Sequence, residues 1–327
     1  MANKTVTVKS SGGNYSTLNA ALVGEQANLV TNTCILTIDC YTMTDTTAVS
    51  VDGYTTSASY YINITSPDGQ SYVLSVTDAT CLANAENFVR ISKITIATVS
   101  PTGSGKDCIH VGAVGLAASN DIRIFRCILK GHNHATRTQS YFSSDDSNLI
   151  LKFWNNICWN VKKLTDNYGI YINACATALI YNNTVIGSEA CCVFAAGNIT
   201  FKNNIFSGSS YAVYELGGTL NAASDYNVAN TDDTGRMYVV EGGMHTHDHT
   251  EHTFTFVDAG AGNYHLNAAD AGAIGYGVSD PGSGLFSDDI DGETRTGTWD
   301  CGADQHAAAV AKQDIGFLRK YKHYLRR

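Results

Sequence analysis

Short runs of alternating apolar and polar residues, each closed by Asn, Gly or Ser, recur along the middle of the chain. The clearest pair is residues 179–187 and residues 200–208, which read LIYNNTVIG and TFKNNIFSG. The second copy follows the first by 21 residues, with Asn204 in the place of Asn183. Runs this short, rich in β-branched and aromatic residues and bounded by turn formers, predict β-strands rather than helices.

The same sequence motif recurs in both directions, at spacings of 21 to 29 residues. Asn156 lies 27 residues before Asn183, Cys127 stands at the equivalent place 29 residues earlier, and Asn227 follows Asn204 by 23 residues. A period of this length indicates a solenoid in which each repeat is one coil. The helical periodicity of α-solenoids and the dense Leu pattern of leucine-rich repeats are both absent between about residues 80 and 260.

The pattern therefore predicts an all-β fold, a single-stranded right-handed parallel β-helix, in which coils stack about 4.8 Å apart and like side chains form ladders. The recurring Asn is expected at a bend, because Asn tolerates the left-handed conformation and its amide can bond to the amides above and below. Four segments are expected: an N-terminal strand and capping helix over 1–30, coils over 31–260, a closing segment over 261–305 and a basic tail over 306–327. About 23 residues per coil allows on the order of ten coils.

A short amphipathic helix is predicted after the Gly-rich turn at residues 11–14. Ser16 is its expected N-cap, and Leu18, Ala21 and Leu22 share one face. A helix of this kind can cover the apolar cross-section that the first coil of a solenoid exposes. We therefore expect it to close the N-terminal end of the β-helix.

Positive charge gathers at the C-terminus, where 6 of the 21 Lys and Arg residues lie in the last 16 positions. Apolar residues there recur near helical spacing, which predicts a short basic helix over residues 306–327. Two roles are open for this tail: an anchor onto a larger assembly, or a cap over the last coil.

Composition narrows the classes of function. The net charge of −9 argues against nucleic acid as a partner. The sequence has no apolar run long enough to span a membrane and no apolar stretch after Met1 that resembles a signal peptide. We therefore expect the protein to be made and folded in a cytoplasm.

The expected cytoplasmic location favours reduced thiols for the ten cysteines. Several, such as Cys127 and Cys158, lie inside strand-like runs, where a thiol behaves as a small core residue. Reduced core cysteines are the favoured interpretation, with disulfides or a metal site as alternatives.

The most specific motifs lie between residues 262 and 305. The chain reads GNYHL at 262–266, DAGAIG at 270–275, DIDGETR at 289–295 and DCGADQ at 300–305. This resembles the closing segment of right-handed parallel β-helix proteins of the pectate-lyase-like superfamily, of the phage tailspike and bacterial surface type. That segment typically reads G-x-Y-H-L, S-P-A-I-D-x-G, D-I-D-G-x-x-R and D-I-G-A-x-E. The predicted N-terminal turn and helix are similar to the start of the same proteins.

The chain departs from that pattern where Asp270 and Ala271 replace Ser-Pro, Cys301 replaces Ile and Gln305 replaces the last Glu. The resemblance implies structural roles for the acidic residues of the segment. Ion pairs between Arg295 and the carboxylates of residues 289, 291 and 300 would tie off the last coil, with a Ca²⁺ site there as the alternative.

One corner of the coils is a candidate site for general acid and base chemistry. Aligning Gly131, Asn160, Gly187 and Gly208 stacks the charged residues that follow them. A Lys beside a carboxylate could act on an acidic sugar, because each group shifts the pKa of the other. An ordinary exposed ion pair is the simpler interpretation. The residues of this corner are His132, His134, Lys162, Lys163 and Glu189.

Glycoside hydrolysis needs two carboxylates about 5 to 9 Å apart. Asp145, Asp146 and Asp166 are candidates because they lie in expected loops, although the positions of Asp145 and Asp166 relative to the Asn ladder do not stack them. The sequence lacks the complete residue sets of polygalacturonases and pectate lyases.

A His-rich run at residues 244–252 is a candidate metal site. In an extended strand His245, His247 and His249 would share one face and could chelate Fe or Zn. The run resembles phage spike and fibre proteins in which His-x-His strands from three chains hold iron on a threefold axis. A solvated loop is the alternative.

Two classes of function fit these observations. The first is a phage-type virion structural or receptor-binding β-helix protein, such as a tailspike, fibre or capsid-surface protein, expected to be a homotrimer in the virion. It would bind a cell-surface glycan, and its basic tail would bind other virion proteins. The second is a polysaccharide lyase or glycoside hydrolase that acts on an acidic polysaccharide. A concave groove with converging carboxylates or bases favours the enzyme, and a flat, extensive surface favours the virion protein.

Overall fold

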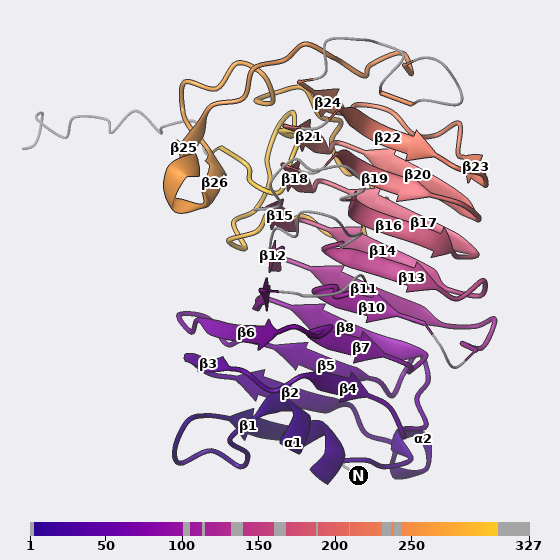
Figure 1. Ribbon diagram of the computed structural model, residues 1–327, viewed down its shortest axis with the longest axis vertical. Helices are drawn as coiled ribbons and strands as arrows, with labels where there is room; N and C mark the ends of the chain where they lie inside the picture. Colours follow the sequence, from indigo (N-terminus) through magenta and orange to yellow (C-terminus); the bar gives the residue numbers. More distant parts are fainter. Residues whose placement is uncertain are drawn as a thin grey trace, which may run out of the picture.

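The computed structural model of the protein describes residues 3–100, 105–112, 115–131, 140–159, 168–187, 189–208, 210–230, 237–238 and 244–306 (Figure 1). Residues 307–327, for which a basic helix is predicted, lie outside these ranges. In the described residues no helix is both long and apolar enough to cross a membrane.

Parallel strands form three sheets in the described part of the chain. The nine-strand sheet comprises β1 (Lys4–Val8), β2 (Leu36–Cys40), β5 (Ile62–Thr65), β8 (Phe88–Ser92), β11 (Asp121–Phe125), β14 (Ile150–Trp154), β17 (Thr177–Tyr181), β20 (Asn198–Lys202) and β23 (Thr219–Leu220). The eight-strand sheet comprises β3 (Met43–Asp45), β6 (Tyr72–Thr77), β9 (Thr95–Val99), β12 (Ile128–Lys130), β15 (Ile157–Trp159), β18 (Thr184–Ile186), β21 (Ile205–Ser207) and β24 (Val228–Ala229). The seven-strand sheet comprises β4 (Val49–Val51), β7 (Leu82–Asn84), β10 (Ile109–Val111), β13 (Phe142–Asp145), β16 (Tyr168–Ala174), β19 (Ala190–Phe194) and β22 (Tyr211–Glu215).

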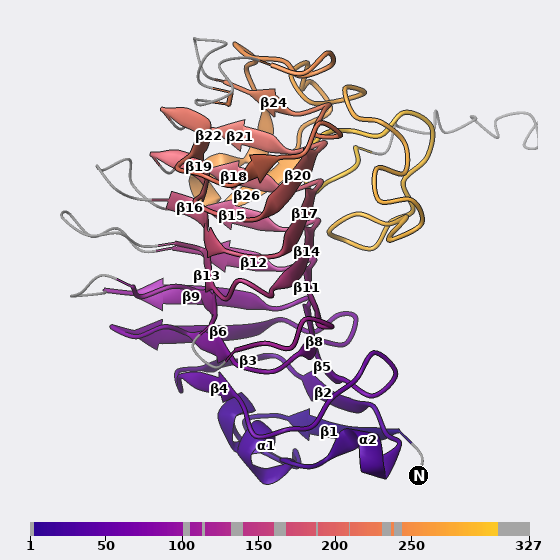
Figure 2. The same ribbon diagram turned by 90° about the vertical axis from the view of Figure 1, so that its right-hand side faces the viewer.

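Each coil passes through the nine-strand, eight-strand and seven-strand sheets in turn, as in the sequence β11, β12, β13. The next coil begins at β14, which pairs in parallel with β11. Figures 1 and 2 show the coils stacked along the long axis of the molecule. The fold is that of a right-handed parallel β-helix, so the predicted fold class is confirmed.

A short helix lies against the first coils, as predicted. It is α1 (Leu18–Gly24), and its buried residues are Leu18, Ala21 and Leu22. Its N-cap is Thr17 rather than Ser16, because Thr17 has the extended backbone and its side chain accepts the Ala20 N–H. A second helix, α2 (Leu29–Asn32), was not predicted.

The predicted Asn ladder runs along the corner between the nine-strand and eight-strand sheets. Asn156, Asn183, Asn204 and Asn227 are fully buried. The side-chain oxygen of each later Asn accepts both the backbone N–H and the side-chain amide of the preceding one, at 2.9 to 3.1 Å. Burial is tolerated because each amide finds partners inside the stack.

Other residue types occupy both ends of the ladder. Cys127 stands where the alignment placed it, and its backbone N–H donates to the side-chain oxygen of Asn156. At the other end the carboxylate of Asp248 accepts the Asn227 N–H at 2.7 Å. The His-rich run therefore supplies the last described rung of the ladder.

The left-handed bend falls one residue before the ladder, which corrects the expectation that the ladder Asn makes it. Positive φ angles occur at Arg126, Asn155, Asn182, Asn203 and Tyr226. In each Asn pair the first residue turns the chain and the second points into the stack. The repeated motif therefore contains two Asn residues because each has a different structural role.

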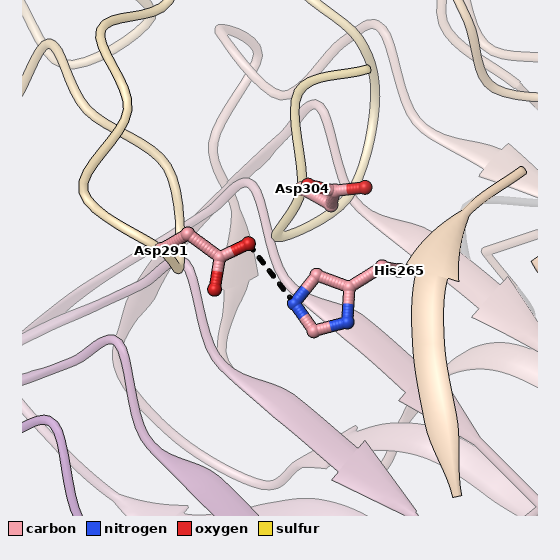
Figure 3. Close-up of side chains that lie close together, drawn as sticks. All are labelled: His265, Asp291 and Asp304. Atoms are coloured by element: carbon pink, nitrogen blue, oxygen red, sulfur yellow. Dashed lines mark ion pairs between the residues drawn. The ribbon is translucent and has the colours of Figure 1, made fainter. Parts of the chain in front are cut away.

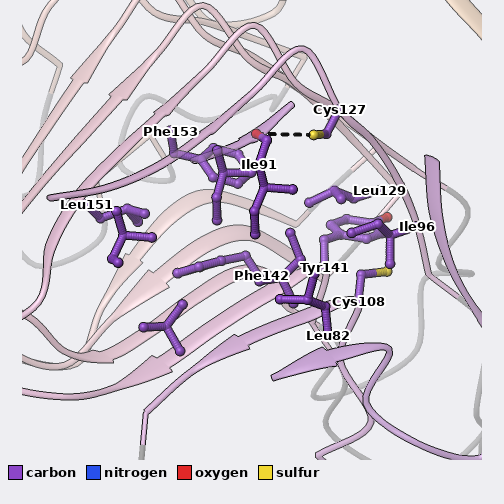
Figure 4. Packing of buried hydrophobic residues seen from close by; sticks show 14 of the residues in the cluster. Leu82, Ile91, Ile96, Cys108, Cys127, Leu129, Tyr141, Phe142, Leu151 and Phe153 are labelled. Carbon is purple, nitrogen blue, oxygen red and sulfur yellow. Dashed lines mark hydrogen bonds between the residues drawn. The ribbon is translucent and has the colours of Figure 1, made fainter. Parts of the chain in front are cut away.

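The interior is a continuous apolar core between the three sheets. Figure 4 shows part of it, where Phe142 and Phe153 from different sheets pack with ring centroids 5.7 Å apart. All ten cysteines are buried, as predicted for core thiols. Burial raises the pKa of thiols such as Cys108 well above its usual value, so these cysteines remain neutral and apolar.

The closing segment lies along the side of the coils and does not simply cap the last one. Its strand β26 (Asn263–Leu266) pairs in antiparallel orientation with β25 (Phe256–Asp258), which precedes the segment and is joined to it through the 3-10 helix η2 (Ala259–Ala261). The outward Asn of successive coils bonds to it: the Asn155 amide donates to Asp288 O and the Asn182 amide to Asp300 O. Figure 2 shows the yellow part of this segment beside the nine-strand sheet, whereas Tyr264 of β26 packs against Trp159 of the eight-strand sheet.

Candidate functional site

The outer face of the seven-strand sheet carries aligned aromatic side chains. Tyr171 in β16 is in register with Tyr214 in β22, with Val193 of β19 between them. Tyr168 and Tyr211 align in the same way, and the Tyr168 and Tyr171 rings stack with centroids 5.5 Å apart. Part-exposed tyrosines in alternate coils form a surface on which flat apolar faces of a ligand can rest.

A small polar cavity adjoins these tyrosines. Its volume is about 220 Å³, and its lining includes Asp107, His110, Ser143, Asp145 and Tyr171. His110 in β10, Ser143 in β13 and Tyr171 in β16 are register partners, so three successive coils present one side chain each. The stacking of coils therefore creates the site from residues far apart in the sequence.

A chain of hydrogen bonds orients His110. The Ser143 hydroxyl donates to the buried Asp107 carboxylate at 2.6 Å, and His110 Nδ1 lies 2.8 Å from the Ser143 oxygen. Because Ser143 uses its proton on Asp107, Nδ1 must carry the proton that joins His110 to Ser143. The neutral imidazole then presents the Nε2 lone pair, which lies 3.9 Å from a carboxylate oxygen of Asp145.

The two carboxylates of the cavity have different surroundings. Asp107 is 5% exposed, and burial raises its pKa, although bonds from Ser143 and Ser140 oppose the shift. The Asp145 side chain is 52% exposed and accepts the Asn173 amide at 3.1 Å. A buried carboxyl, an oriented imidazole and an exposed carboxylate are groups that can move protons at a bound ligand.

Most residues of the predicted corner fall outside the described ranges. These are His132, His134, Lys162 and Lys163, so the corner remains a prediction, and the candidate carboxylate Asp166 also lies outside the described ranges. Glu189 directly precedes β19, and the alignment of Gly187 with Gly208 agrees with the pairing of β18 and β21. Asp145 lies in the cavity of the seven-strand sheet, where its role remains a prediction.

The His-rich run does not form the expected extended strand, because the chain turns at residues 246–247. His247 stacks on Tyr226 and lies 2.7 Å from Asp225 Oδ2, whereas His249 packs edge-on against Tyr276. His245 lies against Tyr238. Asp248 causes the turn by taking its place in the ladder, so within one chain the three imidazoles have separate neighbours. Metal binding between three chains stays a prediction.

Arg295 is buried in the closing segment, but its contacts differ from the predicted ion pairs. Its guanidinium donates to the carbonyl oxygens of Asp288, Gly302 and Ala303 and to the side-chain oxygen of Asn155. Desolvation lowers the pKa of Arg295 to about 10, so it stays charged at neutral pH. One side chain thus joins the two loops of the closing segment to the coils.

The nearby carboxylates hold backbone amides. Asp289 accepts the N–H groups of residues 291, 293 and 305, and Asp300 accepts those of Gly275 and His306. Short acidic side chains at these points fix the loops in the way that Asx turns do. This accounts for the Asp-rich closing motifs through structure, while a Ca²⁺ site remains a prediction.

Asp291 points elsewhere and meets two partners that the sequence did not suggest. Figure 3 shows Asp291 beside His265 and Asp304. Among the described residues this is a group whose potential metal-ligand atoms all lie within 4.8 Å of one another.

No known protein family, curated protein or solved structure matches this chain. The fold therefore defines the class of protein, a parallel β-helix, and the resemblance to the pectate-lyase-like superfamily rests on the motifs alone.

Proposed function

We propose that the protein is a glycan-binding β-helix whose ligand lies along the outer face of the seven-strand sheet. The observation that carries the proposal is the alignment of Tyr171 with Tyr214 and of Tyr168 with Tyr211 in alternate coils, with one coil between the members of each pair. Sugar rings present apolar C–H faces that pack on aromatic rings, and their hydroxyls can bond to groups such as Asp145 and Asn173. The repeating coils suit a repeating polymer.

The binding test compares tyrosines on two sheets. Tyr171→Ala and Tyr214→Ala are expected to weaken binding of a cell-surface polysaccharide about tenfold each, because one stacking contact contributes about 1.4 kcal/mol. Tyr61→Ala, at the nine-strand sheet, is the matched control. Calorimetry with polysaccharides selected on a glycan array provides the affinities. Equal affinities for all three variants and the unaltered protein would remove the proposal.

The virion interpretation rests on the motif resemblance and belongs to the same proposal. A tailspike or fibre protein would be a homotrimer, bound to other virion proteins through residues 306–327. Light scattering on the full chain and on a variant ending at Gln305 tests this. A monomer in both cases contradicts the trimer, and a trimer that dissociates without the tail supports it.

Glycan cleavage is a second candidate, and the oriented His110 favours it. His110 Nε2 could take a proton from a water that attacks the anomeric carbon, while the protonated form of the Asp145 carboxyl gives its proton to the leaving glycosidic oxygen. The variants His110→Ala and Asp145→Asn should then abolish release of reducing ends, and Asp52→Asn, on an exposed residue, should not. Absence of cleavage of every polysaccharide that the protein binds rules out this candidate and leaves the binding proposal intact.

A further inference from the structure

Three potential metal ligands converge from separate parts of the closing segment. His265 lies in β26, Asp291 in the loop after Asp289, and Asp304 in the loop after Cys301 (Figure 3). Their ligand atoms lie within 4.8 Å of one another. Ligands bound about 2.1 Å from one small cation are separated by about 3 to 4 Å, so a small closure of the loops brings all three into range.

His265 is held in the tautomer that a metal site needs. Its Nδ1 lies 2.6 Å from Asn263 Oδ1, an oxygen that can only accept, so Nδ1 carries a proton. The opposite nitrogen, Nε2, is buried and lacks a hydrogen bond of good geometry, although Asp291 Oδ2 is 3.2 Å away. A second residue that fixes the ring and leaves the other nitrogen facing carboxylates is the usual arrangement around metal-bound His.

Asp304 is fixed in a similar way. It is 8% exposed, and its Oδ2 accepts the Leu266 N–H at 2.7 Å, which places the carboxylate beside β26. Its second oxygen makes no hydrogen bond to the described residues. Asp291, by contrast, is 57% exposed and its side chain holds no backbone group, so it can move toward a cation.

The surroundings provide negative charge and an entry path. A cavity of about 440 Å³ is lined by the three residues and by Glu293 and Gln305. Two carboxylates and an imidazole nitrogen are ligands for a divalent cation, and the cavity leaves room for water to complete its coordination. An imidazole nitrogen with carboxylate oxygens suits first-row transition metals better than Ca²⁺ or Mg²⁺.

We infer that His265, Asp291 and Asp304 bind a divalent transition-metal cation of the Zn²⁺ type. The cation joins the β25–β26 pair to both loops of the closing segment, which itself lies against the coils. It acts as a structural clip, independent of glycan binding at the seven-strand sheet.

The test uses the full-length protein, stripped of metal with a chelator and titrated with Zn²⁺ in a calorimeter. Because the His-rich run is a rival site, the titration is run in a background of His245→Gln, His247→Gln and His249→Gln. We expect one equivalent of Zn²⁺ to bind in this background and to raise the melting temperature.

The variant Asp291→Asn, added to the same background, should weaken Zn²⁺ binding at least tenfold and remove the thermal shift. Asp291 is chosen because its side chain supports no backbone, so the variant should fold, which circular dichroism verifies. Asp280→Asn, an exposed Asp in the same segment, is the matched control and should bind like the background. The inference is overturned if the background binds no Zn²⁺, as expected when His265 is protonated and pairs with Asp291 alone, or if Asp291→Asn binds Zn²⁺ unchanged.

Discussion

Removal of one ladder side chain should destabilise the β-helix far more than removal of an exposed Asn. Asn183 is the best position, because its amide donates to the carbonyl oxygens of Phe153 and Tyr181 and to the side chain of Asn204. Its oxygen accepts the backbone N–H of Asn156 at 3.0 Å. The variant Asn183→Ala therefore leaves a buried N–H of the neighbouring coil without a partner.

The size of the effect follows from these bonds. An unpaired buried N–H costs about 1 to 3 kcal/mol, and each lost hydrogen bond about 1 kcal/mol. Together these losses lower the free energy of unfolding by about 4 kcal/mol. Asn198→Ala is the control, because Asn198 is exposed and its side chain makes a bond to Asn221. That variant should change the free energy by less than about 0.5 kcal/mol.

Urea unfolding followed by far-ultraviolet circular dichroism measures both variants. The slope of free energy against urea must be compared as well, because a solenoid that unfolds coil by coil shows a reduced slope. If Asn183→Ala lies within about 1 kcal/mol of the control, the ladder does not stabilise the corner in the way argued.

Three further outcomes are expected. Arg295→Gln should lower the free energy of unfolding by about 3 to 5 kcal/mol, read from urea titration, because the carbonyl oxygens of Asp288 in one closing loop and of Gly302 and Ala303 in the other lose their donor. A change below about 1 kcal/mol contradicts that role. Gly302→Ala should cost about 2 kcal/mol or more in the same assay, because its φ is +92° and a Cβ would stand 2.5 Å from Ile205 Cδ1; an unaltered midpoint would mean that the closing loop is not held there. For Asp107, whose folded-state pKa is raised by burial, the stabilising contribution is present below its unfolded pKa of about 3.9 and is lost as pH rises through the folded pKa. Between about pH 4 and pH 7, the melting temperature of the unaltered protein should therefore fall relative to that of Asp107→Asn. If the difference between the two melting temperatures is the same at both pH values, Asp107 does not titrate in this range.

The polar cavity was not predicted from the sequence because its residues come from different coils. His110, Ser143, Tyr171 and Val193 align across the seven-strand sheet, yet they are separated by 33, 28 and 22 residues. The separations vary because segments of unequal length join the seven-strand sheet to the sheets before and after it in each coil. The alternation of apolar and polar residues does not show which residues of successive coils become neighbours when the connecting segments differ in length.

The tyrosine pairs were not predicted from the sequence for a different reason. Two core residues, Gly169 and Ile170, separate Tyr168 from Tyr171, where a regular strand would place alternate residues outside. The same spacing in β22, between Tyr211 and Tyr214, was the one available signal for an outward aromatic face.

The sequence by itself determined the coil. The repeated Asn pairs set the corner, because one residue must adopt a left-handed bend and the next must satisfy a buried stack, and few residue types other than Asn do both. The N-terminal helix, the buried thiols and the β-strands follow from equally local chemistry.

Tertiary structure decided where the closing segment lies and what it brings together. Arg295 meets Asn155, and His265 meets Asp291 and Asp304, through contacts between parts of the chain that no local pattern relates. The closing segment is held to the coils by the first Asn of each corner pair, such as Asn155 and Asn182. The sequence does not identify the partners of these Asn side chains, because they lie in a distant segment that folds back along the coils. Local hydrogen-bonding and steric preferences act over a few residues, so the sequence specifies the repeat, whereas folding the repeat assembles the candidate sites.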